Sequence, residues 1–190
     1  MNGPIWSFFQ ADHARLDDLL RQAVAGPGEL DANAYAAFRA ELLRHIALEE
    51  KVLLPAARRC RGGEPLPVAR RLRVDHGAIA LLLVPSPTRA LAEETRTILE
   101  PHNCMEEAPD GLYAICDELL ASEAEALVAM ACAYPDVKVA PYHDGPRACR
   151  SADEALSISG GQSALSGRDA DRHRALTAAF SKFIVLPEGK

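Results

Sequence analysis

The stretch that decides the fold covers residues 45–55 and reads HIALEEKVLLP. His45 and Glu49 stand four residues apart in it, and apolar residues recur around them at intervals of three and four. That periodicity is typical of an amphipathic helix. Because four residues advance a helix by little more than one turn, the imidazole and the carboxylate lie on the same face. The stretch therefore predicts a helix that turns both groups toward a bundle core.

The same pattern occurs twice in the chain. Residues 42–50 and 99–107 share the spacing L-x-x-H-x-x-x-E-E, with an offset of 57 residues. Residues 12–20 and 75–83 share D-H followed by branched apolar residues at matching positions, with an offset of 63 residues. Two copies of a helix pair would place the corresponding side chains symmetrically around one bundle centre.

Helical periodicity extends over residues 1–133. Four helices are expected, over residues 5–25, from the potential N-cap Asp31 to Arg61, over 65–84 and over 88–133. Pro55 is expected to kink the second helix, and Pro109-Asp110-Gly111 interrupts the fourth, which resumes at Leu112. Short turns make neighbouring helices antiparallel. The predicted fold is therefore an all-α, antiparallel four-helix bundle over residues 1–133.

Residues 134–190 differ in composition from this bundle. They contain 5 Gly, 4 Pro and 6 Ser and show little periodicity before residue 171. We expect a mostly irregular C-terminal extension with a short terminal helix over residues 171–183. That helix could dock on the bundle or mediate contact with another chain.

Composition excludes several classes of protein. With 48% hydrophobic and 25% charged residues, the chain is expected to fold as a globular protein. The longest apolar stretch, residues 78–84, is too short to span a membrane, and the N-terminus lacks a signal pattern, so a cytoplasmic location is expected. A net charge of −6 argues against a nucleic-acid partner.

Cysteine usage fits the same expectation. The chain has five cysteines and no C-x-x-C motif, so neither a disulfide framework nor a zinc knuckle is indicated. We expect Cys60, Cys104, Cys116 and Cys132 to be small buried residues.

Histidines and glutamates of the four helices are the candidate site. One histidine per helix has apolar neighbours on its own face, and two of the four are followed by a glutamate at the fourth position. The six inward residues are His13, His45, Glu49, His76, His102 and Glu106. The next glutamates, Glu50 and Glu107, are expected to turn away, and Asp12 and Asp75 are assigned to helix solvation or capping.

This donor set suits metal ions. Buried carboxylates are costly unless a cation compensates them, and four imidazoles with two carboxylates fit a pair of octahedral transition-metal ions. Iron fits best, and manganese is the alternative. Zinc usually takes fewer ligands in tetrahedral geometry.

At these residues the chain resembles the hemerythrin-like (HHE cation-binding) family. The resemblance rests on D-H at residues 12–13 and 75–76, HIALEEKVLLP at 45–55 and HNCMEE at 102–107, and it covers roughly residues 5–120. It implies a four-helix bundle with an oxo- or hydroxo-bridged non-haem di-iron centre. Carried over by position, His13 and His45 would hold one iron and His76 and His102 the other. Glu49 and Glu106 would bridge the two.

The chain departs from the oxygen-carrying members of that family. Leu72 stands where they have an additional histidine, one turn before His76, and Glu106 follows His102 at a shorter spacing than their aspartate. The pattern looks more like the sensor and repair branch. Reversible oxygen carriage is therefore not expected.

The favoured function is a non-haem di-iron protein that binds or senses dioxygen, nitric oxide or a related small ligand. Binding or sensing is favoured over an enzymatic role. Two alternatives stay open. One is an iron-handling or redox role, in iron–sulfur centre repair or in reduction of oxygen, peroxide or nitric oxide. The other is a structural bundle that the metal only staples, with the extension as a partner-binding element.

Overall fold

The structure, a computed structural model, describes residues 2–164 and 184–185. Its elements follow the order α1 (Pro4–Ala23), α2 (Ala32–Leu48), the π-helical turn η1 (Glu49–Leu53), α3 (Leu54–Cys60), α4 (Ala69–Leu82), α5 (Arg89–Glu107), α6 (Leu112–Leu119), α7 (Ala124–Cys132), β1 (Lys138–Val139), α8 (Ala152–Ala164) and β2 (Ile184–Val185).

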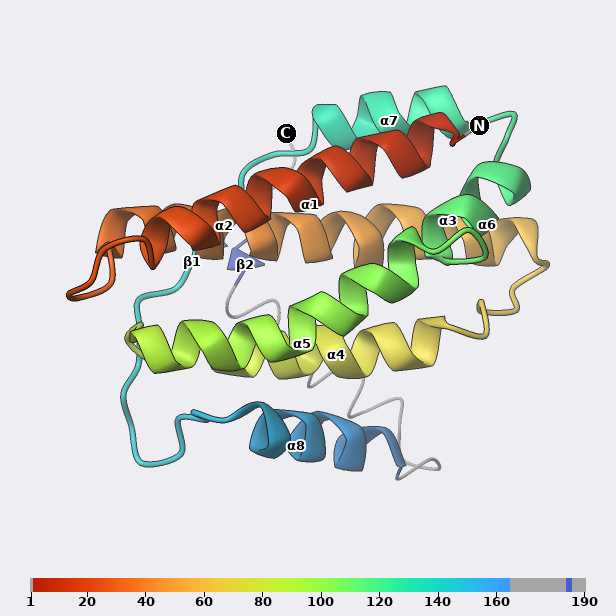
Figure 1. Ribbon diagram of the computed structural model, residues 1–190. Helices are drawn as coiled ribbons and strands as arrows, with labels where there is room; N and C mark the ends of the chain where they lie inside the picture. Colours follow the sequence, from red (N-terminus) through yellow and green to blue (C-terminus); the bar gives the residue numbers. More distant parts are fainter. Residues whose placement is uncertain (1, 165–183, 186–190) are drawn as a thin grey trace.

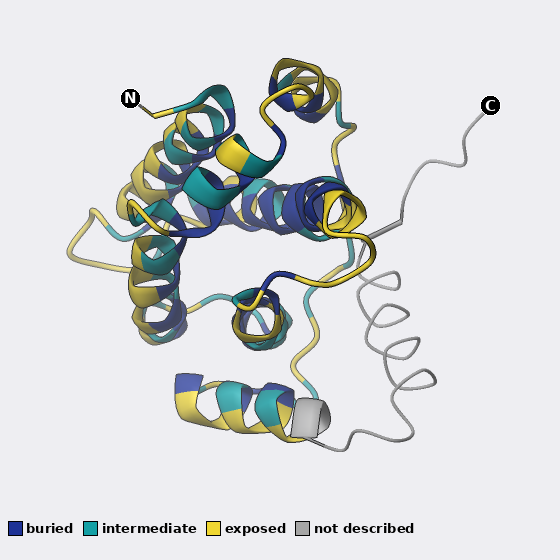
Figure 2. Cartoon of the chain, turned by 90° about the vertical axis from the view of Figure 1, so that its right-hand side faces the viewer, coloured by how far each residue is buried: buried dark blue, intermediate teal, exposed yellow. Residues whose placement is uncertain are grey.

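The antiparallel four-helix bundle is confirmed. One long rod made of α2, η1 and α3 runs beside α1, and α4 runs beside α5 (Figure 1). Viewed along the bundle, the buried faces of these helices turn toward a common interior and the exposed faces turn outward (Figure 2). The central layer of this interior holds the candidate site.

Polar side chains define where the helices begin. The Asp31 carboxylate accepts hydrogen bonds from the backbone N–H groups of residues 33 and 34 at 2.9 and 3.0 Å, which confirms it as the N-cap of α2. Thr88 caps α5 in the same way. At the start of α1, the carboxylate of Asp117, from α6, accepts from the N–H groups of Ile5 and Trp6. Asp117 thereby ties α6 to the first turn of α1.

A π-helical turn replaces the expected kink at Pro55. Proline lacks the N–H that an α-helix would use at this position, and its ring would clash with the carbonyl of Lys51. The helix widens over Glu49–Leu53 instead, where the N–H of Leu54 donates to the carbonyl of Glu49. The rod therefore continues to Cys60 without a break, and Glu49 stands at the first position of the widened turn.

Two expected helix ranges are corrected. The third helix begins at Ala69 rather than near residue 65. Residues 112–133 form two helices, α6 and α7, because the chain leaves helical conformation between Leu119 and Ala124. Both pack against α1, so they do not continue α5 in line.

Buried apolar side chains form two clusters. The first cluster includes Leu16, Leu42 and Ile79. The second includes Phe9 and Leu72. Along α1, the layer between the clusters falls between residues 9 and 16, and along α4 between residues 72 and 79. His13 and His76 lie within these intervals, so a polar layer separates the two clusters.

The extension contains a helix that the sequence pattern did not indicate. Helix α8 packs against α4, where the Ser159 hydroxyl donates to the carbonyl of Val74 at 2.8 Å. Its serines and glycines concealed it, because a helix docked on Gly77 needs small residues rather than an apolar stripe. Strand β1 pairs antiparallel with β2. The terminal helix expected over residues 171–183 lies outside the described residues.

Among the described residues no helix combines the length and apolar character needed to cross a bilayer. Cys116 is buried as expected, whereas Cys60, Cys104 and Cys132 are exposed, which corrects their assignment as buried residues.

Candidate functional site

The structure brings all six candidate residues into one buried layer. His13 comes from α1, His45 from α2 and His76 from α4, while the π-turn η1 supplies Glu49. Helix α5 supplies the two others, His102 and Glu106. Each of the six side chains is at most 5% exposed. The layer is therefore closed to bulk water on most sides.

The four imidazoles face one another in two pairs. His13 and His45 form the α1–α2 half of the site, with their Nε2 atoms 3.1 Å apart. His76 and His102 form the α4–α5 half, with their Nε2 atoms 3.2 Å apart. All four Nε2 atoms thus point into the site.

Both glutamates lie between the two halves. Each carboxylate turns one oxygen toward the α1–α2 half and the other toward the α4–α5 half. The Oε-to-Nε2 distances are 3.7 Å for Glu49–His45, 3.1 Å for Glu49–His76, 3.4 Å for Glu106–His13 and 3.2 Å for Glu106–His102. This is the placement expected of carboxylates that link two centres.

Unsatisfied oxygens show that the site fits a cation. Glu49 Oε2 and Glu106 Oε1 are buried without a hydrogen-bond partner among the described residues, although an imidazole nitrogen lies near each. Buried carboxylate oxygens without partners are costly, and a metal ion removes that cost. Two ligand groups meet the geometry, one with Glu49, Glu106 and the histidines of the α4–α5 half, the other with Glu106 and the histidines of the α1–α2 half.

Four further carboxylates surround the imidazoles, and they correct two expectations from the sequence. Asp12 and Asp75 are buried and serve neither helix solvation nor capping, and Glu50 and Glu107 do not turn away. Each approaches the Nδ1 atom of a histidine on another helix. The distances are 3.0 Å for Asp12–His45, 3.4 Å for Asp75–His102, 3.0 Å for Glu50–His76 and 2.6 Å for Glu107–His13.

The error arose from considering each helix alone. A residue adjacent to a histidine points about 100° away from it on the same helix, but it can face the histidine of the neighbouring helix. The repeated D-H and E-E pairs were the sequence signal that each helix supplies a carboxylate to the histidine of another helix. In the resulting arrangement each Nδ1 faces a carboxylate. An Nδ1–H that donates to this carboxylate leaves the Nε2 lone pair to a metal ion once the Nε2 proton is lost.

Carboxylates hold protons on at least one histidine in each half of the metal-free site. Burial lowers the pKa of His13, but Glu106 and Glu107 outweigh it and raise that pKa to about 9. For His76, burial is likewise outweighed by Glu49 and Glu50, and the pKa rises to about 10. The site therefore holds positive charge at neutral pH among its carboxylates.

The outer aspartates are held in the ionised form. Burial raises the pKa of Asp12, but His45 and Arg15 outweigh it and lower that pKa to about 2. The pKa of Asp75 is lowered in the same way, against burial, by His102 and Arg71. Ionised aspartates strengthen the hydrogen bonds that orient the imidazoles.

Tyr113 belongs to the site, and the sequence reasoning missed it. Its hydroxyl lies 2.7 Å from Glu49 Oε1, 3.1 Å from Glu106 Oε2 and 3.1 Å from His13 Nε2. The ring is fully buried and stacks on Phe9 at 4.9 Å between centroids. Burial and then the two glutamates raise the pKa of Tyr113, which keeps the phenol protonated. No repeat pointed to it, because Tyr113 lies on α6, outside the duplicated helix pairs.

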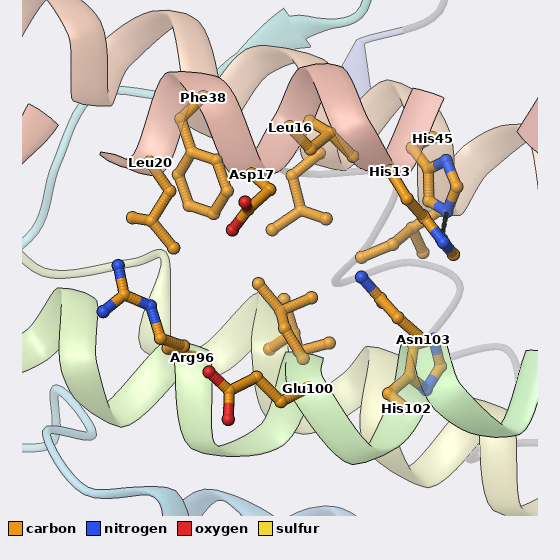
Figure 3. Close-up of a pocket in the computed structure, with 14 residues that line it drawn as sticks. His13, Leu16, Asp17, Leu20, Phe38, His45, Arg96, Glu100, His102 and Asn103 are labelled. Atoms are coloured by element: carbon orange, nitrogen blue, oxygen red, sulfur yellow. Dashed lines mark hydrogen bonds between the residues drawn. The ribbon is translucent and has the colours of Figure 1, made fainter. Parts of the chain in front are cut away.

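A cavity of about 50 Å³ adjoins the site. Three of the four histidines lie at one end of it, His13, His45 and His102, with both members of the α1–α2 half among them (Figure 3). Apolar side chains such as Leu16 and Phe38 line its length. Polar side chains face it across α1 and α5, including Asp17, Arg96, Glu100 and Asn103. The lining residues thus include exposed positions on α1 and α5 as well as the imidazoles.

Comparison with known proteins agrees with this geometry. The chain matches the family described as Hemerythrin HHE cation binding domain over residues 5–114. No curated protein and no solved structure gave a significant match. Because the family match covers more than half of the chain, the protein belongs to the hemerythrin HHE cation-binding family. The family binds metal ions, typically iron, and the His/Glu cluster lies in the matched segment.

Proposed function

We propose that this hemerythrin-family protein binds two non-haem iron ions and uses them to bind or sense dioxygen or nitric oxide. His13 and His45 would hold one ion, His76 and His102 the other, and Glu49 and Glu106 would be shared. The observation that carries the proposal is the convergence of four Nε2 atoms and two partnerless carboxylate oxygens in one layer. Manganese offers the same coordination preferences and is the alternative metal.

Bound iron would supply a position for a small ligand and one-electron redox chemistry. The chain supplies the remaining requirements. The outer carboxylates orient the imidazoles through Nδ1, and the apolar walls of the cavity favour a small neutral ligand over water. Because the cavity ends mainly at the α1–α2 half, we place ligand binding there.

Sensing is a better fit than reversible oxygen carriage. Leu72 takes the position of an additional histidine in the oxygen carriers, and it is fully buried in an apolar cluster. The site therefore has four histidines among its candidate ligands and lacks the additional histidine of the oxygen carriers. With fewer protein ligands around the metal, a bound small ligand is less protected.

Reduction of oxygen or peroxide is the second candidate function. The Tyr113 hydroxyl supports it, because a protonated phenol beside the shared carboxylates can hold and deliver a proton. Turnover consumes protons, whereas reversible binding consumes none overall, so the products formed after reduction and exposure to oxygen separate the two functions.

Metal analysis with spectroscopy tests the proposal. Protein purified in air should contain two irons per chain and show the near-ultraviolet bands of an oxo-bridged diferric pair. Added azide should change the spectrum, because the site keeps an open position. A bound metal whose spectrum ignores azide would favour a structural role for the metal. Reduction followed by oxygen should give rapid autoxidation without a long-lived adduct.

A further inference from the structure

Basic residues concentrate in one hairpin of the bundle. Residues 51–73, here called the basic hairpin, contain seven basic residues and one acidic residue. The rest of residues 1–133 contains six basic and nineteen acidic residues. A positive segment therefore stands within a negative bundle.

The basic hairpin occupies one end of the molecule. It comprises most of η1, the whole of α3, the connection that follows and the first turns of α4, all at the same end of the bundle (Figure 1). Its basic side chains belong to exposed residues, namely Lys51, Arg58, Arg59, Arg61, Arg70, Arg71 and Arg73. The surface is thus available to another molecule.

Two of these arginines contact carboxylates that hold the site. Arg71 Nε lies 3.0 Å from both oxygens of Asp75, whose Oδ2 is 3.4 Å from His102 Nδ1. Arg73 Nε lies 3.3 Å from Glu50 Oε2, and the other oxygen of Glu50 is 3.0 Å from His76 Nδ1. Only one carboxylate separates each guanidinium from an imidazole of the α4–α5 half.

We propose that the basic hairpin docks a small acidic protein that carries single electrons. The inference rests on the proposed function, because ferric iron must be reduced before it can bind dioxygen. In each encounter the reduced carrier would lose one electron and one ferric ion would become ferrous, so two encounters would reduce a pair. A carrier docked on this surface would lie beside the α4–α5 half, opposite the end at which the cavity brings in a ligand.

The charge pattern favours an acidic protein over other polyanions. An extended nucleic acid would meet the acidic remainder of the bundle, which repels it, whereas a compact protein can touch the hairpin alone. A membrane surface normally needs apolar anchors as well as charge. The exposed large apolar residues of the described chain are Met130 and Ile158, and neither belongs to the hairpin.

Binding of a stand-in carrier tests the proposal. The full chain, iron-loaded and metal-free, is titrated calorimetrically with a plant-type [2Fe–2S] ferredoxin, an acidic carrier, and with cytochrome c, a basic carrier. We expect ferredoxin to bind at about 20 mM salt and its affinity to fall at about 200 mM salt, because salt screens the attraction between exposed charges. Cytochrome c, which is basic, should show no binding that depends on the hairpin.

Charge-reversal variants identify the surface. The triple variant Arg58→Glu, Arg59→Glu, Arg61→Glu leaves untouched the arginines that contact the site. The matched control, Arg21→Glu, Lys138→Glu, Arg147→Glu, changes the net charge equally at exposed positions elsewhere. We expect the hairpin variant to weaken ferredoxin binding at least about tenfold and the control less than about twofold. Circular dichroism should show that both variants fold.

Three results would overturn the proposal. These are the absence of ferredoxin binding at low salt, equal weakening in the two triple variants, and tighter hairpin-dependent binding to duplex DNA or to anionic vesicles. Iron content is measured separately on the same samples. A chain without iron that still binds ferredoxin through the hairpin would refute the proposed function and leave the docking surface standing.

Discussion

The two halves of the site are alike in their imidazoles and unlike in their surroundings. In each half the Nε2 atoms are 3.1–3.2 Å apart and each Nδ1 faces a carboxylate from another helix. The Tyr113 hydroxyl, however, lies beside the α1–α2 half, and both histidines of this half line the cavity. The α4–α5 half instead has Arg71 and Arg73 behind its outer carboxylates.

This difference shows how a duplicated motif acquires separate roles. The repeat places equivalent donors around the centre, and elements outside the repeat then make the halves unequal. Helix α6 brings a phenol to the half that faces the cavity. The four-residue ligand group containing both glutamates belongs to the α4–α5 half, whereas the α1–α2 group has three residues. We therefore expect the α4–α5 half to hold metal more firmly.

Removing a shared glutamate should have the largest effect. Glu106 belongs to both ligand groups, so Glu106→Ala should remove nearly all bound iron. Glu49→Ala leaves the three-residue group of the α1–α2 half intact and should retain at most about one iron per chain. Glu118→Ala, on the exposed face of α6, is the matched control. Full occupancy in either site variant would refute the sharing of carboxylates.

Acidity should oppose metal binding in both halves. At least one histidine per half has a pKa raised above neutral pH in the metal-free protein, to about 9 for His13 and about 10 for His76. Metal binding must displace both protons, so the apparent affinity should rise up to about tenfold per proton for each pH unit between pH 7 and 8.5. Calorimetry in buffers of different ionisation enthalpy counts the protons released.

The same pKa shifts set the stability of the metal-free protein. The pKa values of His13 and His76 are higher in the folded state than the usual 6.5. Their contribution to the free energy of unfolding is therefore complete below about pH 6.5 and is lost as the pH rises through 9 to 10. Urea denaturation at several pH values measures this loss. For the preceding prediction, a metal affinity that stays flat between pH 7 and 8.5 would contradict the raised pKa values of His13 and His76.

Replacing an outer aspartate should have a smaller effect. Asp12→Asn and Asp75→Asn keep the shape of the side chain but remove the charge that strengthens the hydrogen bond to an imidazole. We expect iron affinity to fall about 10- to 100-fold. Asp12→Asn should cost more, because Asp12 lies closer to His45 than Asp75 does to His102.

Competition with a chelator measures these affinities. The exposed substitution Asp18→Asn on α1 is the control and should leave the affinity unchanged. Unaltered affinity in both site variants would mean that the aspartates do not orient the histidines.

Tyr113→Phe should have the smallest effect on the fold. It removes the hydroxyl that donates to a buried glutamate, so the metal-free protein should lose about 1–2 kcal/mol of unfolding free energy. Iron content should stay near two, whereas the product of oxygen reduction should change if the phenol delivers a proton. Tyr134→Phe is the control outside the site. Equal stability and equal oxygen chemistry in the two variants would remove Tyr113 from the functional residues.

Much of the fold and of the site could be predicted from the periodicity and the internal repeat of the sequence. The helical bundle follows from apolar spacing, and the convergence of histidines follows from their equal positions in two copies of one motif. The outer carboxylates required knowledge of which helix faces which, because Asp12 meets a histidine of α2 rather than its own neighbour His13.

Features outside the repeat escaped prediction for different reasons. Tyr113 reaches the site from α6, which is held against α1 by apolar packing and by the hydrogen bonds of Asp117 to the start of α1. Helix α8 docks through small residues, which produce no apolar stripe. The π-turn at Glu49–Leu53 depends on how the chain absorbs Pro55, and composition alone does not distinguish a kink from a widened turn.

Iron stoichiometry tests the central claim most directly. The full chain is isolated without chelator and, in parallel, reconstituted with ferrous iron under anaerobic conditions, and bound metal is then counted per chain. The account predicts two tightly bound irons, with the near-ultraviolet bands of a bridged diferric pair after exposure to air. Protein that retains neither iron nor manganese by either route would contradict it.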